Sequence, residues 1–223
     1  MKFYLSSYKI GNETARLKEM IQDNRRTAYI PNALDFSADV QRRSESNDKD
    51  INELKSVGLE PELFDLRRYF GKEDELASAL EDFGVVWVRG GNTFVLMQAM
   101  NMSGFDTFLK TSNDREMLYG AYSAGVCVLA PTLHGIELVD DPMQKPYGND
   151  VETVWEGRGI LDYYVVPHYR SEHQESGLAE KAVQYYIDNK LLFRALRDGE
   201  LITIGQDLIG LQFYSVSQPR VRN

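Results

Sequence analysis

Ser123 lies among small residues in the stretch Leu118-Tyr-Gly-Ala-Tyr-Ser-Ala-Gly-Val-Cys-Val-Leu-Ala130. A short apolar run before the serine and a helix-compatible run after it predict a strand, a tight turn and a helix. Such a turn exposes a serine hydroxyl as a nucleophile, and the N–H groups of the following helix point toward it. The usual pattern is G-x-S-x-G. Because Ala121 stands at the first glycine, close packing of a strand on a helix explains the motif equally well.

A serine nucleophile needs a base to take its proton, and the chain has three histidines. His168 follows the apolar run Tyr163–Val166 after one residue, Pro167, so it stands at the end of a predicted strand, where the sites of open α/β folds gather. His173 falls in a predicted helix cap, where exposure is expected, and His134 falls in a loop or at a sheet edge. We take His168 as the base, although a structural role would be preferred for it if Ser123 were absent.

A third group would hold the imidazole in the right tautomer and stabilise the imidazolium. We prefer Asp198, in the turn Leu196-Arg-Asp-Gly199, to Glu200, because a residue in a tight Asp-Gly turn can face inward. Asp-Gly turns are also common for conformational reasons alone. The chain order Ser, His, Asp differs from the Ser, Asp, His order of the α/β-hydrolases, which disfavours an ordinary lipase or esterase.

Backbone N–H groups fixed in advance would stabilise the oxyanion that forms on the substrate. The N–H of Ala124 follows the serine directly, and the N–H of Gly91 lies in a loop after another apolar run. Gly90 and Gly91 would let a substrate lie against the backbone. The same loop also reads as a helix entry capped by Asn92 or Thr93, and the two roles are compatible.

The elements that must position these residues alternate between short apolar runs and helical patterns. Strands are predicted at Lys2–Ser7, Thr27–Ile30, Pro61–Leu66, Val85–Val88 and Ile160–Val166. Helices are predicted at Ala15–Gln22, Ile51–Val57, Glu73–Phe83, Phe94–Met102, Phe105–Lys110 and, after a capping box at Ser171–Gln174, to about Asn189. This order predicts right-handed β-α-β crossovers and a mostly parallel sheet between two helix layers, a three-layer α/β/α sandwich.

The remaining segments are predicted as loops or short strands. Ala38–Lys49 is polar and reads as an exposed loop and helix start, and Pro131–Asp141 should contain a short extended segment. Leu191–Leu196, Glu200–Ile204 and Leu208–Val216 predict a terminal antiparallel section. Since no internal repeat or linker is visible, we expect one domain over residues 1–223.

The composition excludes several classes of protein. A net charge of −9 argues against a nucleic-acid surface, which needs a basic face. No segment approaches the ~20 apolar residues of a membrane span, and the N-terminus lacks the apolar stretch of a signal peptide. The single cysteine, Cys127, permits no internal disulfide and is expected to be a buried small residue. We therefore expect a soluble cytoplasmic protein with no membrane or nucleic-acid partner.

Four motifs, in this order, resemble the peptidase E family of serine peptidases. They are Gly90-Gly-Asn-Thr-Phe94, Tyr122-Ser-Ala-Gly125, Val166-Pro-His-Tyr169 and Leu196-Arg-Asp-Gly199. Members of this family are α-aspartyl dipeptidases, distantly related to cyanophycinases, with a flavodoxin-like sheet similar to that of class I glutamine amidotransferases. The resemblance extends from Lys2 to Leu211.

The resemblance implies that Ser123 is the nucleophile, His168 the base, and the Gly91 and Ala124 N–H groups the oxyanion hole. Three positions depart from the family pattern. Ala121 replaces a glycine, and Val166 replaces the asparagine two places before the histidine. Asp198 stands where the family has a glutamate, so the third triad role needs a closer approach.

A peptidase selective for an N-terminal aspartate needs a cation for the side-chain carboxylate, and an arginine fork binds a carboxylate in bidentate fashion. Arg170, two residues beyond His168, is the best-placed candidate. Arg89 and Arg158 are others, although Arg158 is more simply a surface residue. Asn92 is a further candidate for substrate binding.

The sequence thus predicts a metal-independent serine peptidase, without a cofactor, that cleaves small peptides and in particular dipeptides with an N-terminal aspartate. The alternatives are a related amidase, such as a cyanophycinase-like or broader small-peptide hydrolase, and a catalytically silent binding module. A nucleotide- or metal-dependent enzyme is disfavoured because no phosphate loop or ligand-spaced cluster of His, Cys and Asp is visible. Whether the chain forms a homodimer is left open.

Overall fold

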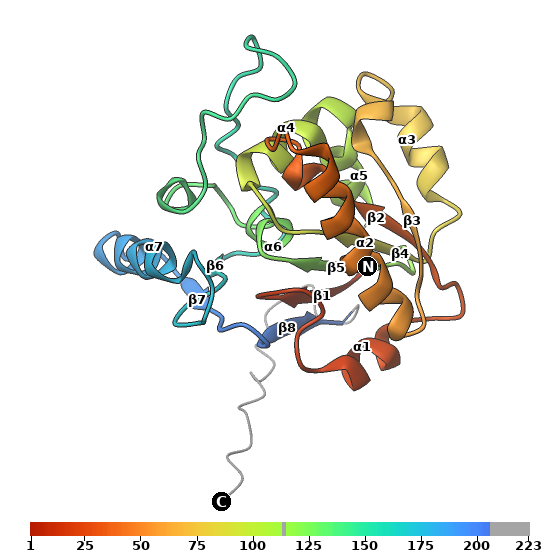
Figure 1. Cartoon of the computed structure of the whole chain (residues 1–223), viewed down its shortest axis with the longest axis horizontal. Coiled ribbons are helices and arrows are strands. Elements are labelled where there is room, and N and C mark those ends of the chain that lie inside the picture. Colours follow the sequence, from red (N-terminus) through yellow and green to blue (C-terminus); the bar gives the residue numbers. More distant parts are fainter. Residues whose placement is uncertain (113–114, 206–223) are drawn as a thin grey trace, which may run out of the picture.

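A six-stranded sheet forms the centre of the computed structural model, which describes residues 1–112 and 115–205 (Figure 1). Its strands lie in the order β3 (Glu60–Leu63), β2 (Arg26–Ile30), β4 (Val85–Val88), β5 (Leu118–Tyr122), β1 (Lys2–Ser6) and β8 (Leu201–Ile204). The first five are parallel, and β8 runs antiparallel to β1. The carboxyl ends of β4, β5 and β1 therefore meet at one edge of the sheet, where ligand sites of such folds form.

Helices cover both faces of this sheet. They are α1 (Thr14–Met20), α2 (Val40–Ser56), α3 (Glu73–Leu80), α4 (Thr93–Ser103), α5 (Phe105–Thr111) and α6 (Ala124–Cys127), with short 3-10 turns at Asn32–Leu34, Leu66–Tyr69 and Ile136–Leu138. Alternate residues of β4 show the two layers. Val85 and Trp87 pack with α1 and α2, whereas Val86 and Val88 pack with the layer of α3 to α6. The predicted three-layer α/β/α sandwich is confirmed.

The chain after α6 builds a second, smaller unit beside the main sheet. β6 (Tyr164–Val166) pairs in parallel with β7 (Phe193–Ala195), and α7 (Ser176–Asp188) packs on this pair. The predicted antiparallel section is therefore confirmed for β8 but wrong for β7. The third predicted strand, Leu208–Val216, lies outside the described residues.

Three predicted segments differ from the structure. The polar stretch Ala38–Lys49, predicted as an exposed loop and helix start, contains the start of α2, but the helix begins already at Val40 and runs without a break to Ser56. The expected capping box at Ser171–Gln174 does not start a helix, since α7 begins only at Ser176. Pro131–Asp141 contains a 3-10 turn and a single bridge between Thr132 and Glu156 instead of a strand.

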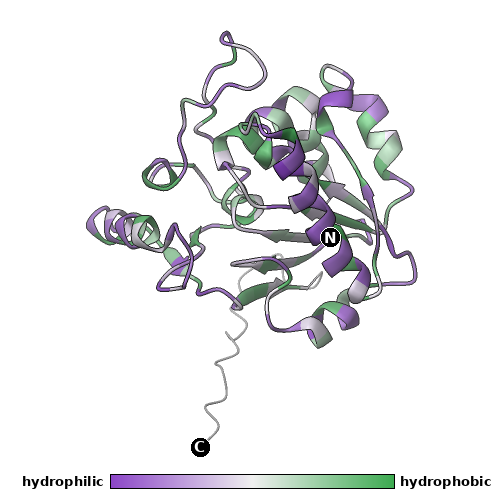
Figure 2. Ribbon diagram, in the orientation of Figure 1, coloured by the Kyte–Doolittle hydropathy of each residue, from purple (hydrophilic) through white to green (hydrophobic). Residues whose placement is uncertain are grey.

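Hydropathy follows this architecture (Figure 2). The central strands are hydrophobic, and α2 is largely hydrophilic because only Asp50 and Leu54 of its side chains are buried. Within residues 1–112 and 115–205, no helix is both long and apolar enough to span a bilayer.

Candidate active site

Ser123 occupies a strained turn between β5 and α6. Its backbone has φ 50° and ψ −117°, a left-handed conformation that non-glycine residues rarely adopt. Small neighbours permit this turn, because a Cβ on Gly125 would lie 2.5 Å from the carbonyl oxygen of Val88. The structure thus has the strand, sharp turn and helix expected of a nucleophile elbow.

The glycine loop after β4 lies against this turn, because β4 and β5 are neighbours in the sheet. A Cβ on Gly90 would come within 2.8 Å of the Cβ of Ser123. Gly91 has φ +147°, and a Cβ there would lie 2.4 Å from the carbonyl oxygen of Ala33. Gly90 is thus required for the loop to approach the serine this closely, and Gly91 for its approach to Ala33.

Arg89 fixes the orientation of this loop. Its Nε donates to the carbonyl oxygen of Gly90 at 3.0 Å. In a trans peptide the C=O and the following N–H point in opposite directions, so the N–H of Gly91 points away from Arg89. Among the described residues, neither this N–H nor that of Ala124 has a hydrogen-bond partner. The two donors are therefore available to an oxygen atom of a ligand.

His168 and Asp198 form a close pair. The Nδ1 of His168 lies 2.7 Å from Oδ1 of Asp198, and the histidine is 3% exposed. Of the two acidic candidates, Asp198 contacts the imidazole, whereas Glu200 accepts a hydrogen bond from the N–H of Arg197. The shorter carboxylate reaches the ring because β6 and β7 are paired, which brings the turn after β7 next to the residue that follows β6.

Two serines that sequence reasoning missed hold this pair. Ser7 Oγ donates to Oδ1 of Asp198 at 2.8 Å and accepts from the N–H of His168 at 2.8 Å. Ser171 Oγ accepts from the N–H of Asp198 at 2.8 Å. A signal for Ser7 was present in the sequence, because it follows the first predicted strand at the sheet edge where sites form. No local pattern indicated Ser171, whose hydroxyl reads as a helix cap.

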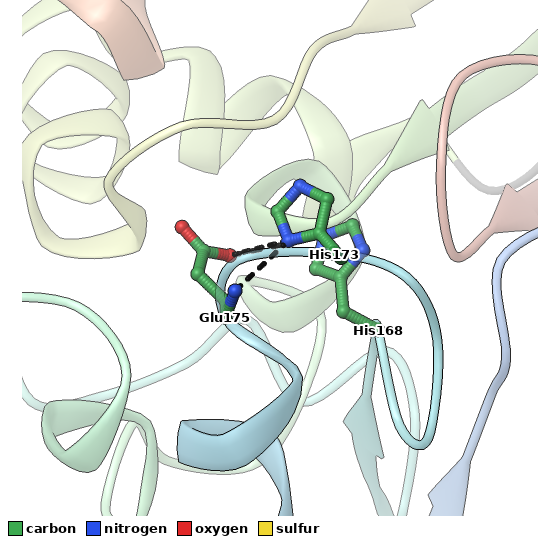
Figure 3. A group of neighbouring side chains, drawn as sticks. All are labelled: His168, His173 and Glu175. Atoms are coloured by element: carbon green, nitrogen blue, oxygen red, sulfur yellow. Dashed lines mark hydrogen bonds and ion pairs between the residues drawn. The ribbon is translucent and has the colours of Figure 1, made fainter.

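Ser123 and His168 line the same open cavity of about 380 Å³, together with Gly90 and Gly91. No described residue is hydrogen-bonded to Ser123 Oγ. The Nε2 of His168 instead lies 3.9 Å from Oε2 of Glu175, and its ring stacks on that of His173 with centroids 3.7 Å apart (Figure 3). The expected exposure of His173 in a helix cap was therefore wrong, because the residue precedes α7 and packs into the site.

Burial controls the charge of these groups. Desolvation, with a smaller contribution from His173, lowers the pKa of His168 below its ordinary value of 6.5 despite the opposing effect of Asp198. Burial likewise raises the pKa of Glu175, and the nearby charge of Asp198 adds to this. A neutral imidazole, the form that accepts a proton, is thus favoured at His168.

The arginines lie elsewhere than predicted. Arg170 points outward with 61% of its side chain exposed, stacks on Tyr169 and lies 3.6 Å from Glu180, so it does not line the cavity. Arg158 is buried in an ion pair with Asp106, so neither the substrate-binding role nor the surface role predicted for it holds.

Arg89 does line the cavity, but its guanidinium is engaged by α2. It donates to Asn47 Oδ1 at 2.6 Å and Ser46 Oγ at 3.1 Å, and it lies 3.7 Å from the carboxylate of Asp50. Its charge is therefore already compensated, which leaves little of it for a substrate carboxylate.

Asn92 is the helix cap that the sequence predicted. Its Oδ1 accepts from the N–H groups of Phe94 and Val95, and its Nδ2 donates to the carbonyl of Asp141. Its side-chain oxygen and one amide hydrogen are thus used within the fold, and its assignment to substrate binding stays a prediction. Cys127 is buried as expected, and burial raises the pKa of its thiol.

Known proteins share this architecture. The model of the family described as Peptidase family S51 matches residues 7–211. An uncharacterized peptidase of Pasteurella multocida (strain Pm70) is 30% identical over 95 residues, which cover 43% of this chain and 44% of that relative. Peptidase E of Streptomyces coelicolor is 26% identical over 148 residues, which cover 64% of this chain and 57% of the relative. The matched segments thus span about half the length of these curated relatives.

A solved structure from Listeria monocytogenes EGD-e, named a "Putative Peptidase E Protein", superposes with a TM-score of 0.73 at 23% identity. The superposition covers 91% of this chain and 93% of that one, so the fold is shared throughout. The family match and the names of the relatives support a serine-type peptidase. Because the family model covers nearly the whole chain, the protein belongs to peptidase family S51.

Proposed function

We propose that this protein hydrolyses the amide bond of small peptides through an acyl-enzyme on Ser123. The observation that carries the proposal is the hydrogen bond of 2.7 Å between His168 and Asp198, on the cavity that Ser123 also lines. A serine in a strained elbow, a buried neutral imidazole and a carboxylate on its far nitrogen are the parts of a Ser-His-Asp triad.

The reaction follows from these positions. Ser123 Oγ attacks the peptide carbonyl while Nε2 of His168 takes its proton, and Asp198 stabilises the imidazolium through Nδ1. The N–H groups of Gly91 and Ala124 hold the oxyanion. His168 then gives the proton to the leaving amine, and water releases the acyl group by the reverse sequence. The imidazole must first turn from Glu175 toward the serine, an adjustment common when substrate completes a site.

The charges around the cavity favour a small dipolar substrate with more than one carboxylate. Its lining contains two basic side chains from α2, Arg42 and Lys49, which have no ion-pair partner among the described residues. In place of Arg170, these cations are available to the carboxylates of a dipeptide with an N-terminal aspartate. Glu175, in the loop between β6 and α7, also lines the cavity and is available to the α-amino group of the dipeptide. The single buried cysteine fits a cytoplasmic setting for this activity.

The decisive experiment screens the purified protein against a dipeptide library with the Ser123→Ala variant as control. We expect turnover of Asp-Xaa peptides by the parent and none by the variant, which should keep the same fold by circular dichroism. Unchanged turnover by Ser123→Ala would refute the assignment of the nucleophile.

Two alternatives rest on particular observations. The outward position of Arg170 favours a related amidase with another substrate, and the same library, extended to β-linked peptides, would reveal it. The unbonded hydroxyl of Ser123 favours a catalytically silent binding module. A fluorophosphonate probe separates the two: labelling at Ser123 supports an enzyme, and absence of labelling in folded protein supports the silent module.

A further inference from the structure

The loop between β6 and α7 brings together three metal-ligating side chains, His168, His173 and Glu175 (Figure 3). One ligand atom from each lies within 4.8 Å of the other two. Oε2 of Glu175 is 3.9 Å from Nε2 of His168 and 3.7 Å from Nδ1 of His173. No spacing rule indicated this cluster, because the loop before α7, and not a helical repeat, brings the two histidines together as a stacked pair.

These distances are close to those of an occupied site. Ligand atoms about 2.1 Å from a tetrahedral zinc ion lie about 3.4 Å from one another. The separations of 3.9 Å and 3.7 Å from Glu175 exceed this by roughly 0.5 and 0.3 Å, which side-chain rotation can supply. Binding gives up a long hydrogen bond, from the N–H of Glu175 to Nδ1 of His173 at 3.3 Å, and tilts the two rings out of their stack so that both lone pairs point to one ion.

The residue that orients His168 as a ligand, Asp198, is also in place. Asp198 binds Nδ1 of His168, which leaves the lone pair of Nε2 directed toward the cavity. Such a carboxylate–histidine pair orients the ring and raises the basicity of the ligating nitrogen in zinc sites. Two imidazoles and one carboxylate form the donor set of open zinc sites, in which water completes the coordination. Imidazole nitrogens select zinc over magnesium or calcium.

We propose that His168, His173 and Glu175 form a zinc-binding site whose occupation inhibits the enzyme. The binding site stands on its own geometry, whereas its inhibitory effect rests on the proposed function. A zinc ion on Nε2 of His168 occupies the lone pair that would take the proton of Ser123. Zinc and catalysis therefore compete for one nitrogen atom, and the metal acts as a reversible block and not as a cofactor.

Zinc chloride titrated into the full chain by calorimetry tests the binding. We expect one Zn²⁺ per chain, and affinity weakened by about tenfold or more in His173→Gln and Glu175→Gln. His134→Gln is the matched control, because His134 stacks on Trp155 outside the cavity and should bind zinc as the parent does. Ser123→Ala should also bind as the parent does. Equal affinity of the parent and the two ligand variants, or no binding, overturns the site.

The inhibitory effect is measured as the ratio of turnover with and without zinc. This ratio should fall in the parent, recover with EDTA, and stay near one in His173→Gln whatever its own turnover. A parent that turns over peptides and binds zinc without losing activity overturns the inhibition. A protein that binds zinc at this site but turns over no peptide refutes the proposed function and leaves the binding site supported.

Discussion

The carboxylate of Asp198 is the residue-scale feature on which the orientation of His168 depends. Asp198→Asn replaces an acceptor by an amide that can present its NH₂ to Nδ1, which favours the wrong tautomer of the imidazole. In serine peptidases this change lowers kcat by about 10⁴-fold, and we expect a loss of that order here with little change in KM. Steady-state kinetics on a dipeptide measure both.

Glu200→Gln is the matched control for that substitution. Glu200 lies in the same turn, but its carboxylate accepts from the N–H of Arg197 and, among the described residues, is not hydrogen-bonded to His168. It should keep kcat within a few-fold of the parent. Equal losses in the two variants would mean that the turn, and not the carboxylate of Asp198, supports the reaction.

Arg89 acts on the reaction through the peptide that joins Gly90 to Gly91. Arg89→Lys keeps the charge beside Asp50 but loses the Nε donor that fixes the carbonyl of Gly90. We expect kcat to fall by roughly tenfold, less than the ~10²- to 10³-fold cost of removing an oxyanion donor outright. KM should change little, because the lost interaction orients a group that acts in the transition state. A rise in KM at unchanged kcat would instead assign Arg89 to substrate binding.

At this scale the sequence predicted the residues whose chemistry depends on backbone turns. Small side chains around Ser123 and Gly91 are demanded by close backbone approach, so they leave a local pattern. The direction of a long side chain leaves none. Arg170 follows His168 by two residues, yet a left-handed φ of 50° turns its side chain away from the cavity. The contact between Ser7 and Asp198, separated by 191 residues, is equally invisible locally.

Helix α4 is anchored at its N-terminus more firmly than the other helices that adjoin the cavity. Asn92 caps two N–H groups and holds the segment after the 3-10 turn at Ile136–Leu138 through Asp141. Because the residue is buried, its loss leaves these donors without water. We expect Asn92→Ala to lower the free energy of unfolding by about 2 kcal/mol, the upper end for a helix cap. Urea denaturation followed by circular dichroism measures it.

Asp39 offers the matched comparison, since it caps α2 through a single bond to the N–H of Arg42 at an exposed position. Asp39→Ala should cost about 0.5 kcal/mol, the lower end of the range. Similar losses in the two variants would show that burial of the cap does not matter here.

Element boundaries were predicted well where hydrophobic periodicity decides them and poorly where polar residues do. Val85–Val88 and Phe105–Lys110 matched β4 and α5 to within a residue because the apolar side chains that set their patterns are buried. The first half of α2 has almost no apolar side chains, so its helical state shows no periodicity. The hydroxyl of Ser171 accepts from the N–H of Asp198 and not from an N–H at the start of a helix. The sequence alone does not show which of two possible N–H donors such a hydroxyl will accept from.

At the scale of the whole molecule, the alternation of strands and helices predicted the three-layer sandwich but not which strands pair at the edge of its sheet. Crossover handedness and burial favour a parallel centre for any such chain. Whether the last strands extend the main sheet or pair apart depends on contacts between distant segments. β6 lies outside the main sheet because it pairs with β7, and helix α7 buries its side chains in a separate core.

The stability of the whole fold should depend on pH through the half-buried residue Asp140, whose carboxyl group lies at the N-terminus of α4. Burial raises its pKa from 3.8 to about 7, although the N–H of Thr93 donates to it at 2.8 Å. A carboxyl group whose pKa is higher in the folded state than in the unfolded state does not lower the free energy of unfolding well below pH 4, where it is protonated in both states. As the pH rises from 4 to 7 the carboxyl group ionises first in the unfolded state, so the free energy of unfolding falls. Above pH 7 this loss reaches about 4 kcal/mol.

Asp140→Asn tests this dependence, since the amide oxygen can still accept from Thr93 but carries no charge. Relative to the parent, the variant should gain about 2–3 kcal/mol in the free energy of unfolding between pH 5 and pH 8. Urea denaturation at both pH values measures the difference, in which the contributions of all other groups cancel. Asp141→Asn, at the exposed neighbouring position, is the control and should show no such gain. If the free energy of unfolding changes between pH 5 and pH 8 by the same amount in both variants and in the parent, the carboxylate of Asp140 is already ionised at pH 5. The N-terminus of α4 would then stabilise that charge more than burial disfavours it.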